Sequence, residues 1–79
     1  MTIEESVEFV QDLIDNQVEV SIEMTDPNAP RLRCEVVSVE EHLTDGWRVT
    51  LGRGEDGFVS SLRGFMIDLN EGLYRLVGK

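Results

Sequence analysis

The sequence contains a single cysteine and a single histidine, and this scarcity excludes two common ways of stabilising a short chain. Cys34 alone cannot form an internal disulfide, and Cys34 with His42 cannot supply the four ligands of an ordinary structural zinc site. A chain of 79 residues buries only about 60% of its unfolded surface, so its fold is expected to be marginally stable. Self-association through an unpaired strand edge remains as the means of stabilisation to test.

Long apolar runs are also missing from the sequence. No stretch approaches the roughly 18 apolar residues that a membrane span needs, and residues 1–9 carry acids where a secretory signal carries bases. The sequence therefore predicts a soluble, cytoplasmic protein with no membrane contact. Because linkers, internal repeats and low-complexity tracts are absent, we expect one domain over residues 1–79, with a helix over 1–16 and an antiparallel sheet over 17–79.

Lysine is the third scarce residue, and acids are in large excess. Six of the seven basic residues are arginine, Lys79 is the only lysine, and 16 acids give a net charge of −9. Residues 1–26 hold eight of the acids and no base. This composition resembles that of proteins from salt-loving archaea; a mildly acidic protein with a chance shortage of lysine is the other interpretation. At about 1 M salt the Debye length is about 3 Å, so a halophilic protein would gain no long-range attraction from this charge.

Residues 1–16 have the pattern of an amphipathic helix. Thr2 and Glu5 have the spacing of a capping box, and Asn16 is able to take the left-handed conformation that closes a helix. The polar face carries five acids, which favours either a solvated surface or a docking surface for a basic partner. The apolar stripe consists of Ile3, Val7, Val10 and Ile14, widened by Phe9 and Leu13.

Alternating apolar residues predict strands on both sides of a loop that contains proline. Residues 18–24 alternate with period two, residues 25–30 (TDPNAP) interrupt the pattern, and residues 31–40 (RLRCEVVSVE) resume it. In the second strand the inward positions change from even to odd numbers around Val36 and Val37. An extra residue or a change of face there bends the strand, as in a sheet that curls over itself to enclose a core. The alternative is a strand buried on both faces at these two valines, under the helix.

The second half of the chain adds further strands and one ambiguous segment. Residues 47–51 alternate after an Asp-Gly turn, and residues 70–72 suit a hairpin turn with glycine at the left-handed position, before a last strand over 73–77. Residues 58–69 fit a helix or a strand; we expect a strand, kinked at Gly64. The expected fold is therefore α+β, with an N-terminal amphipathic helix packed on a strongly bent antiparallel sheet of five or six strands.

The sequence shows no pattern typical of catalysis or cofactor binding. His42 lies in a run with acids over residues 40–45, but adjacent residues of a turn point in different directions, so this spacing does not bring metal ligands together. The serines have no second histidine to activate them, Cys34 falls in an apolar alternation, and no glycine-rich segment has the spacing of a phosphate loop. We expect no enzyme activity, no cofactor, no metal and no small-molecule substrate.

The arginines are the candidate contact residues. In the expected sheet Arg31 and Arg33 share a face of the second strand, Arg48 points outward from the third, and Arg75 lies on the last. Together they form either a phosphate-binding strip or ordinary cross-strand pairs with acids, and we favour the pairs. The aromatic residues available for stacking on bases are Trp47, Phe65 and Tyr74. The acids available for pairing are Glu19, Glu23 and Glu35.

The order of elements and one short motif are similar to those of a known family. A helix followed by a bent antiparallel sheet, with Leu62-Arg63-Gly64 late in the chain, resembles the Sm-like proteins and, more broadly, the SH3-like small barrels. The resemblance implies a small barrel in which Arg63 contacts RNA, and a ring of subunits closed by strand edges.

Two functions follow as expectations. The first is a non-catalytic interaction module that self-associates or binds a protein partner. The second is an Sm-like barrel that binds single-stranded RNA. The possible contact residues for RNA or for a protein partner are Arg31, Arg33, Arg48 and Arg63.

Overall fold

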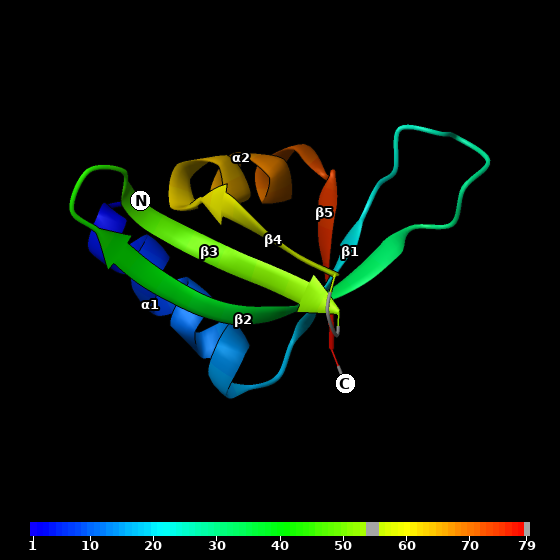
Figure 1. Cartoon of the computed structure of the whole chain (residues 1–79). Helices are drawn as coiled ribbons and strands as arrows, with labels where there is room; N and C mark the ends of the chain where they lie inside the picture. Colours follow the sequence, from blue (N-terminus) through cyan, green and yellow to red (C-terminus); the bar gives the residue numbers. More distant parts are fainter. Residues whose placement is uncertain (54–55, 79) are drawn as a thin grey trace.

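The fold is a five-stranded antiparallel sheet with two helices packed on one of its faces (Figure 1). The computed structural model describes residues 1–53 and 56–78, without the side chains of Arg53 and Asp56. The elements are α1 (Ile3–Asp15), β1 (Glu19–Ile22), β2 (Leu32–His42), β3 (Gly46–Arg53), β4 (Asp56–Ser61), α2 (Leu62–Glu71) and β5 (Tyr74–Val77). The strands lie in the order β4-β3-β2-β1-β5, so β4 and β5 form the two edges of the sheet.

The start of α1 confirms the capping box expected from the sequence. The Thr2 hydroxyl accepts a hydrogen bond from the Glu5 backbone N–H, and the Thr2 N–H donates to the Glu5 carboxylate; both distances are 3.1 Å. The two bonds satisfy backbone donors that have no partner inside the helix. The bond from the Thr2 N–H also lowers the pKa of Glu5, because it stabilises the ionised carboxylate.

The end of α1 differs from the expectation by one residue. Asn16 has φ −92°, and Gln17, with φ 56°, is the left-handed residue. The Gln17 N–H bonds to the Ile14 carbonyl at 3.1 Å, and the Val18 N–H bonds to the Leu13 carbonyl at 2.9 Å. These two bonds form a Schellman motif, in which the left-handed position comes after the C-cap residue and not at it.

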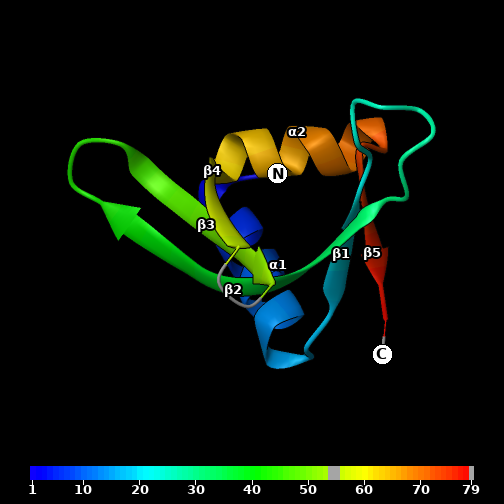
Figure 2. The same ribbon diagram turned by 45° about the vertical axis from the view of Figure 1, so that its right-hand side comes forward.

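Strand β2 bends where the alternation of apolar residues slips, as Figure 2 shows. The register between β2 and β3 shifts between Val36 and Ser38, which marks a β-bulge. Val36 is buried, Val37 is 54% exposed, and Val39 packs against the core, so the inward positions change from even to odd numbers as expected. The exposure of Val37 contradicts the alternative in which β2 is buried on both faces at this point.

Residues 58–69 do not form the single strand expected from the sequence. β4 ends at Ser61 and α2 follows at once, so the expectation of a continuous sheet over residues 17–79 is wrong here. The Ser61 hydroxyl accepts a hydrogen bond from the Gly64 N–H at 3.0 Å and caps the helix. A Cβ at Gly64 would lie 2.9 Å from that hydroxyl, so the glycine makes room for the cap.

The glycine expected in a hairpin turn instead ends α2. Gly72 has φ 84°, and its N–H bonds to the Leu69 carbonyl at 3.3 Å. A left-handed glycine is typical both of hairpin turns and of helix C-termini, so residues 70–72 alone do not distinguish the two. The burial pattern does, because a helical period buries Phe65 and leaves Ile67 outside, whereas a strand would place both on one face.

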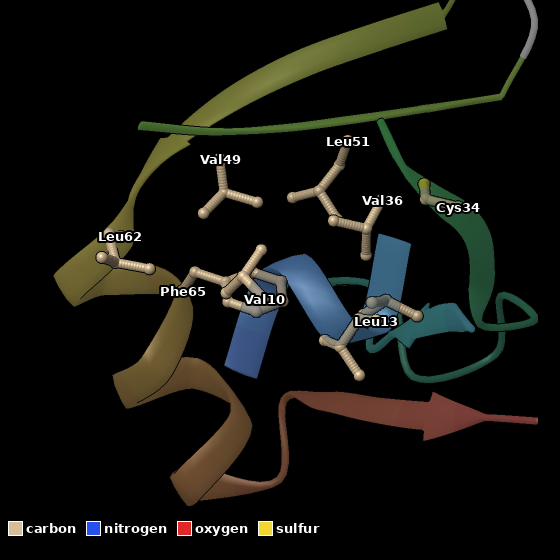
Figure 3. Close-up of a cluster of buried hydrophobic side chains, with 9 residues drawn as sticks. Val10, Leu13, Cys34, Val36, Val49, Leu51, Leu62 and Phe65 are labelled. Carbon is tan, nitrogen blue, oxygen red and sulfur yellow. The ribbon is translucent and has the colours of Figure 1, made fainter. Parts of the chain in front are cut away.

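The core lies between the inward face of the sheet and the two helices (Figure 3). Val10 from α1 and Phe65 from α2 belong to the same cluster and face Val49 and Leu51 of β3. The buried apolar residues are Val10, Leu13, Val20, Cys34, Val36, Val49, Leu51, Leu62 and Phe65. Because α1 and α2 cover the inward face, the bent sheet buries its apolar side without closing on itself. The closed barrel that we expected therefore does not form.

Candidate functional site

An apolar groove of about 610 Å³ lies where the start of α1, the β2–β3 turn and α2 meet. Its volume falls within the range of about 300–1,000 Å³ that is usual for ligand-binding clefts. The apolar residues that line it are Met1, Ile3, Trp47, Leu62, Met66 and Ile67. This surface, called the groove from here on, is the candidate functional site.

The walls of the groove come from elements whose other parts belong to the core. Helix α2 buries Phe65 and leaves Ile67, on its other side, 48% exposed. Trp47 is on the inward face of β3, but it lies beyond the core residue Val49 and stays partly exposed. Ile3 is on the first turn of α1, ahead of the buried positions of that helix, and is 64% exposed. The groove is thus an apolar surface that the described chain leaves open to solvent.

The polar rim of the groove includes Asp45, Arg63 and Glu71. Arg48 donates to the Asp45 carboxylate, which lines the groove at the β2–β3 turn. The Arg63 guanidinium is exposed at the start of α2 and makes no hydrogen bond or ion pair with the residues that the structure describes. Arg63 is therefore the basic group of the rim that an incoming partner would meet.

The other two candidate arginines lie at the opposite end of the sheet. Arg31 donates from Nε to the Ser21 hydroxyl at 2.9 Å, and from Nη2 to the carbonyls of Ser21 and Leu73 at 2.8 Å each. Arg33 forms an ion pair with Glu19 at 3.2 Å, across β1 and β2, in line with the cross-strand interpretation. Of the four arginines of the expected strip, Arg33 and Arg75 lie opposite Ser21 on its two sides and Arg31 bonds to Ser21, whereas Arg48 lies at the other end of the sheet. Among the four candidate contact residues, three are engaged in contacts within the chain and Arg63 lines the groove.

Among the three aromatic residues that we considered for stacking on bases, Trp47 is the one that lines the groove. Phe65 is completely buried, and its ring centroid lies 5.6 Å from that of Tyr74, with the planes tilted by 58°. Burial raises the pKa of the Tyr74 hydroxyl, and the charges of Asp68 and Cys34 add to the effect. Phe65 and Tyr74 thus pack in or against the core, and of these three residues Trp47 remains available to contact a ligand.

The described residues offer neither a metal cluster nor a helix that could cross a membrane. They include no group of three or more His, Cys, Asp or Glu side chains that could hold a metal ion. His42 is exposed at the end of β2, opposite Gly46, and Cys34 is buried in the core. Neither α1, with 13 residues, nor α2, with 10, has the length and hydropathy needed to cross a membrane.

The sequence pattern alone does not reveal the groove. Once residues 62–71 are known to be helical, their periodicity shows that Ile67 faces away from Phe65. No sequence pattern indicates that the N-terminus lies close to Trp47, because Met1 and Trp47 are far apart in the chain and belong to different parts of the fold.

Comparisons with known proteins identify no relative of this chain. A scan against protein-family models, a search of curated proteins and a search of solved structures each return no match. The functional argument therefore rests on the residues of this chain.

Proposed function

We propose that the protein is a non-catalytic interaction module whose groove binds the apolar side of a basic amphipathic helix in a protein partner. The observation that carries the proposal is the exposure of the apolar side chains around the groove, 81% for Met1 and 48% for Ile67. Contiguous exposed apolar surface is characteristic of binding sites. An amphipathic helix fits such a surface because its apolar residues recur on one face and enter the groove together.

The charge of the chain supports a basic partner. The net charge is −9, and α1, which forms one wall of the groove, contains no base. A basic partner is attracted by the net charge of the chain and by the acids of α1 at low salt, whereas a second copy in the groove would bring two acidic helices together. The acids of α1 are Glu4, Glu5, Glu8, Asp12 and Asp15.

A synthetic amphipathic helix made of leucine and lysine is a suitable probe, with Trp47 as the reporter. Trp47 is the only tryptophan of the chain, so its fluorescence reports on the groove directly. We expect saturable binding with a shift of the emission to shorter wavelength, because the indole loses contact with water. Ile67→Glu should weaken binding by about tenfold or more, since burying an apolar side chain contributes about 1.5–3 kcal/mol and each 1.4 kcal/mol is about tenfold.

The matched control for this experiment is Leu76→Glu. Leu76 is 43% exposed, close to the value for Ile67, but it lies on β5 and does not line the groove. This variant should bind like the unmodified protein, and a peptide of the same composition without an apolar stripe should not bind. A probe that leaves the fluorescence unchanged, or that binds both variants equally, would remove the groove as the binding site.

Single-stranded RNA is the second candidate ligand, because Arg63 and Trp47 line the same groove. An exposed guanidinium in the same groove as an indole offers a phosphate contact and a stacking surface, and the Sm-like resemblance points to the same arginine. The net charge of −9 opposes this function, as does the use of Arg31, Arg33 and Arg48 within the chain.

We expect a fluorescent oligouridine to show no binding even at low salt, where electrostatic attraction to phosphates is strongest. Binding whose log affinity falls linearly with log salt concentration would establish the RNA function instead, and Arg63→Met should then abolish it. Because the peptide and RNA titrations use the same protein, either one can succeed while the other fails.

A further inference from the structure

Strand β4 leaves one edge of the sheet open. It pairs with β3 on one side, and no described strand pairs with its other side (Figure 1). A free edge presents a row of backbone donors and acceptors that another strand is able to complete. β4 is therefore a possible template for a strand from a second molecule.

Past its first residue, Asp56, β4 lacks the usual protections against edge pairing. Residues 57–61 contain no lysine, no proline and no other charged residue. The register between β3 and β4 runs from Arg48↔Ser61 to Arg53↔Asp56 without a shift, so no bulge twists the edge away. The opposite edge strand, β5, is shorter, with 4 residues against 6, and carries Arg75. The two edges thus differ, and β4 is the one suited to pairing.

Most of β4 also lies in the longest acid-free stretch of the sequence. Residues 57–67 (GFVSSLRGFMI) form the longest stretch without an acid, in a protein whose net charge is −9. Val59 is 54% exposed and Phe58 36%. Charge depletion together with exposed apolar residues is characteristic of the centre of a protein interface. Two copies that met there would avoid the repulsion between the acidic parts of the chain.

We infer that β4 pairs antiparallel with β4 of a second copy, across a two-fold axis, so that the two sheets become one. Residues directly opposite each other in such a pair point to the same face, so the axis must pass through a residue and not between two residues. We place the axis at Val59, so that Val59 lies opposite Val59 of the second copy and all paired residues fall within residues 57–61. This places Phe58 opposite Ser60 and Gly57 opposite Ser61. The interface does not use the groove, so it does not depend on the function proposed above.

The first test is the molar mass in solution, measured by light scattering over a range of concentrations. We expect a dimer that Val59→Lys dissociates, weakening association by about tenfold or more, since each pairing event would place two lysines directly opposite each other at the axis. Val37→Lys is the matched control, because Val37 has the same 54% exposure but lies on the central strand β2. The measurement is made at low salt and at about 1 M potassium chloride, where the Debye length is about 3 Å. A monomer at both salt concentrations, a dimer unaffected by Val59→Lys, or a larger ring would overturn the inference.

The second test does not depend on the stability of the lysine variant. Val59→Cys should form an intermolecular disulfide in oxidised glutathione, because the axis joins this residue to itself and opposite Cα atoms of an antiparallel pair lie about 4.5–5.5 Å apart, within the range that a disulfide spans. Val37→Cys should remain uncrosslinked under the same conditions, and the native Cys34 is buried. Equal crosslinking of the two variants, or none at Val59→Cys, would contradict the proposed register.

Discussion

Phe65→Ala is expected to lower the free energy of unfolding by about 3–5 kcal/mol, the cost typical of removing a buried phenylalanine. Phe65 is the largest of the fully buried side chains and joins α2 to the rest of the core, where its ring meets Tyr74. A domain of 79 residues has a total stability of only about 4–12 kcal/mol, at about 0.05–0.15 kcal/mol per residue. The melting temperature, followed by circular dichroism, should fall by about 15 °C or more, at about 4–8 °C per kcal/mol.

Ile67→Ala is the control on the same helix. Ile67 is 48% exposed, so its truncation should lower the free energy of unfolding by less than about 1 kcal/mol. The comparison also tests the secondary structure, because a strand would place Phe65 and Ile67 on one face and make their costs similar. Equal losses from the two substitutions would contradict α2.

Arg31→Met should lower the free energy of unfolding by about 2 kcal/mol, an unusually large effect for an arginine near the surface. The guanidinium of Arg31 bonds to the Ser21 hydroxyl and to the carbonyls of Ser21 and Leu73, so it ties β1 to the turn before β5. Methionine keeps most of the apolar stem and removes all three hydrogen bonds. The change should appear as a lower midpoint in urea with an unchanged slope.

Arg33→Met provides the comparison, two residues further along the chain. Arg33 makes an ion pair with Glu19, but its side chain is 52% exposed, and such pairs contribute about 0–1 kcal/mol. The midpoint should therefore move little in this variant. If the two arginine variants shift the midpoint equally, the hydrogen bonds of Arg31 do not have the structural role assigned to them.

The two proposed interfaces use the same acid-free segment, residues 57–67. Its first part is the free edge of β4, and its second part is the wall that α2 contributes to the groove. A dimer formed through Val59 would carry two grooves. A partner with two basic helices would then gain avidity, provided that its linker spans the distance between them.

The sequence was sufficient where local interactions decide the structure. The capping box of Thr2 and Glu5 depends on residues three apart, and the apolar stripe of α1 has one period over the whole helix. The sequence also indicated the bulge after Val36, because an extra residue in a strand moves the later inward-facing residues from even to odd numbers.

The sequence was insufficient where two local structures use the same residues. Residues 62–71 have apolar residues at both helical and alternating positions, and Gly72 suits both a helix end and a hairpin turn. The groove could not be predicted from the sequence either, since Ile3, Trp47 and Ile67, which line it, come from three separate elements.

The amino-acid sequence by itself determined α1, the strands before residue 54 and the bend in β2, because these follow from periodicity and from contacts between neighbouring residues. The tertiary structure alone decided that residues 62–71 are helical, since Phe65 fills the core only from a helix packed over the sheet. It also decided that the sheet stays open, because the two helices bury the inward face and leave β4 and β5 as edges. Burial of apolar surface between distant segments, which no local pattern encodes, is the physical reason for the difference.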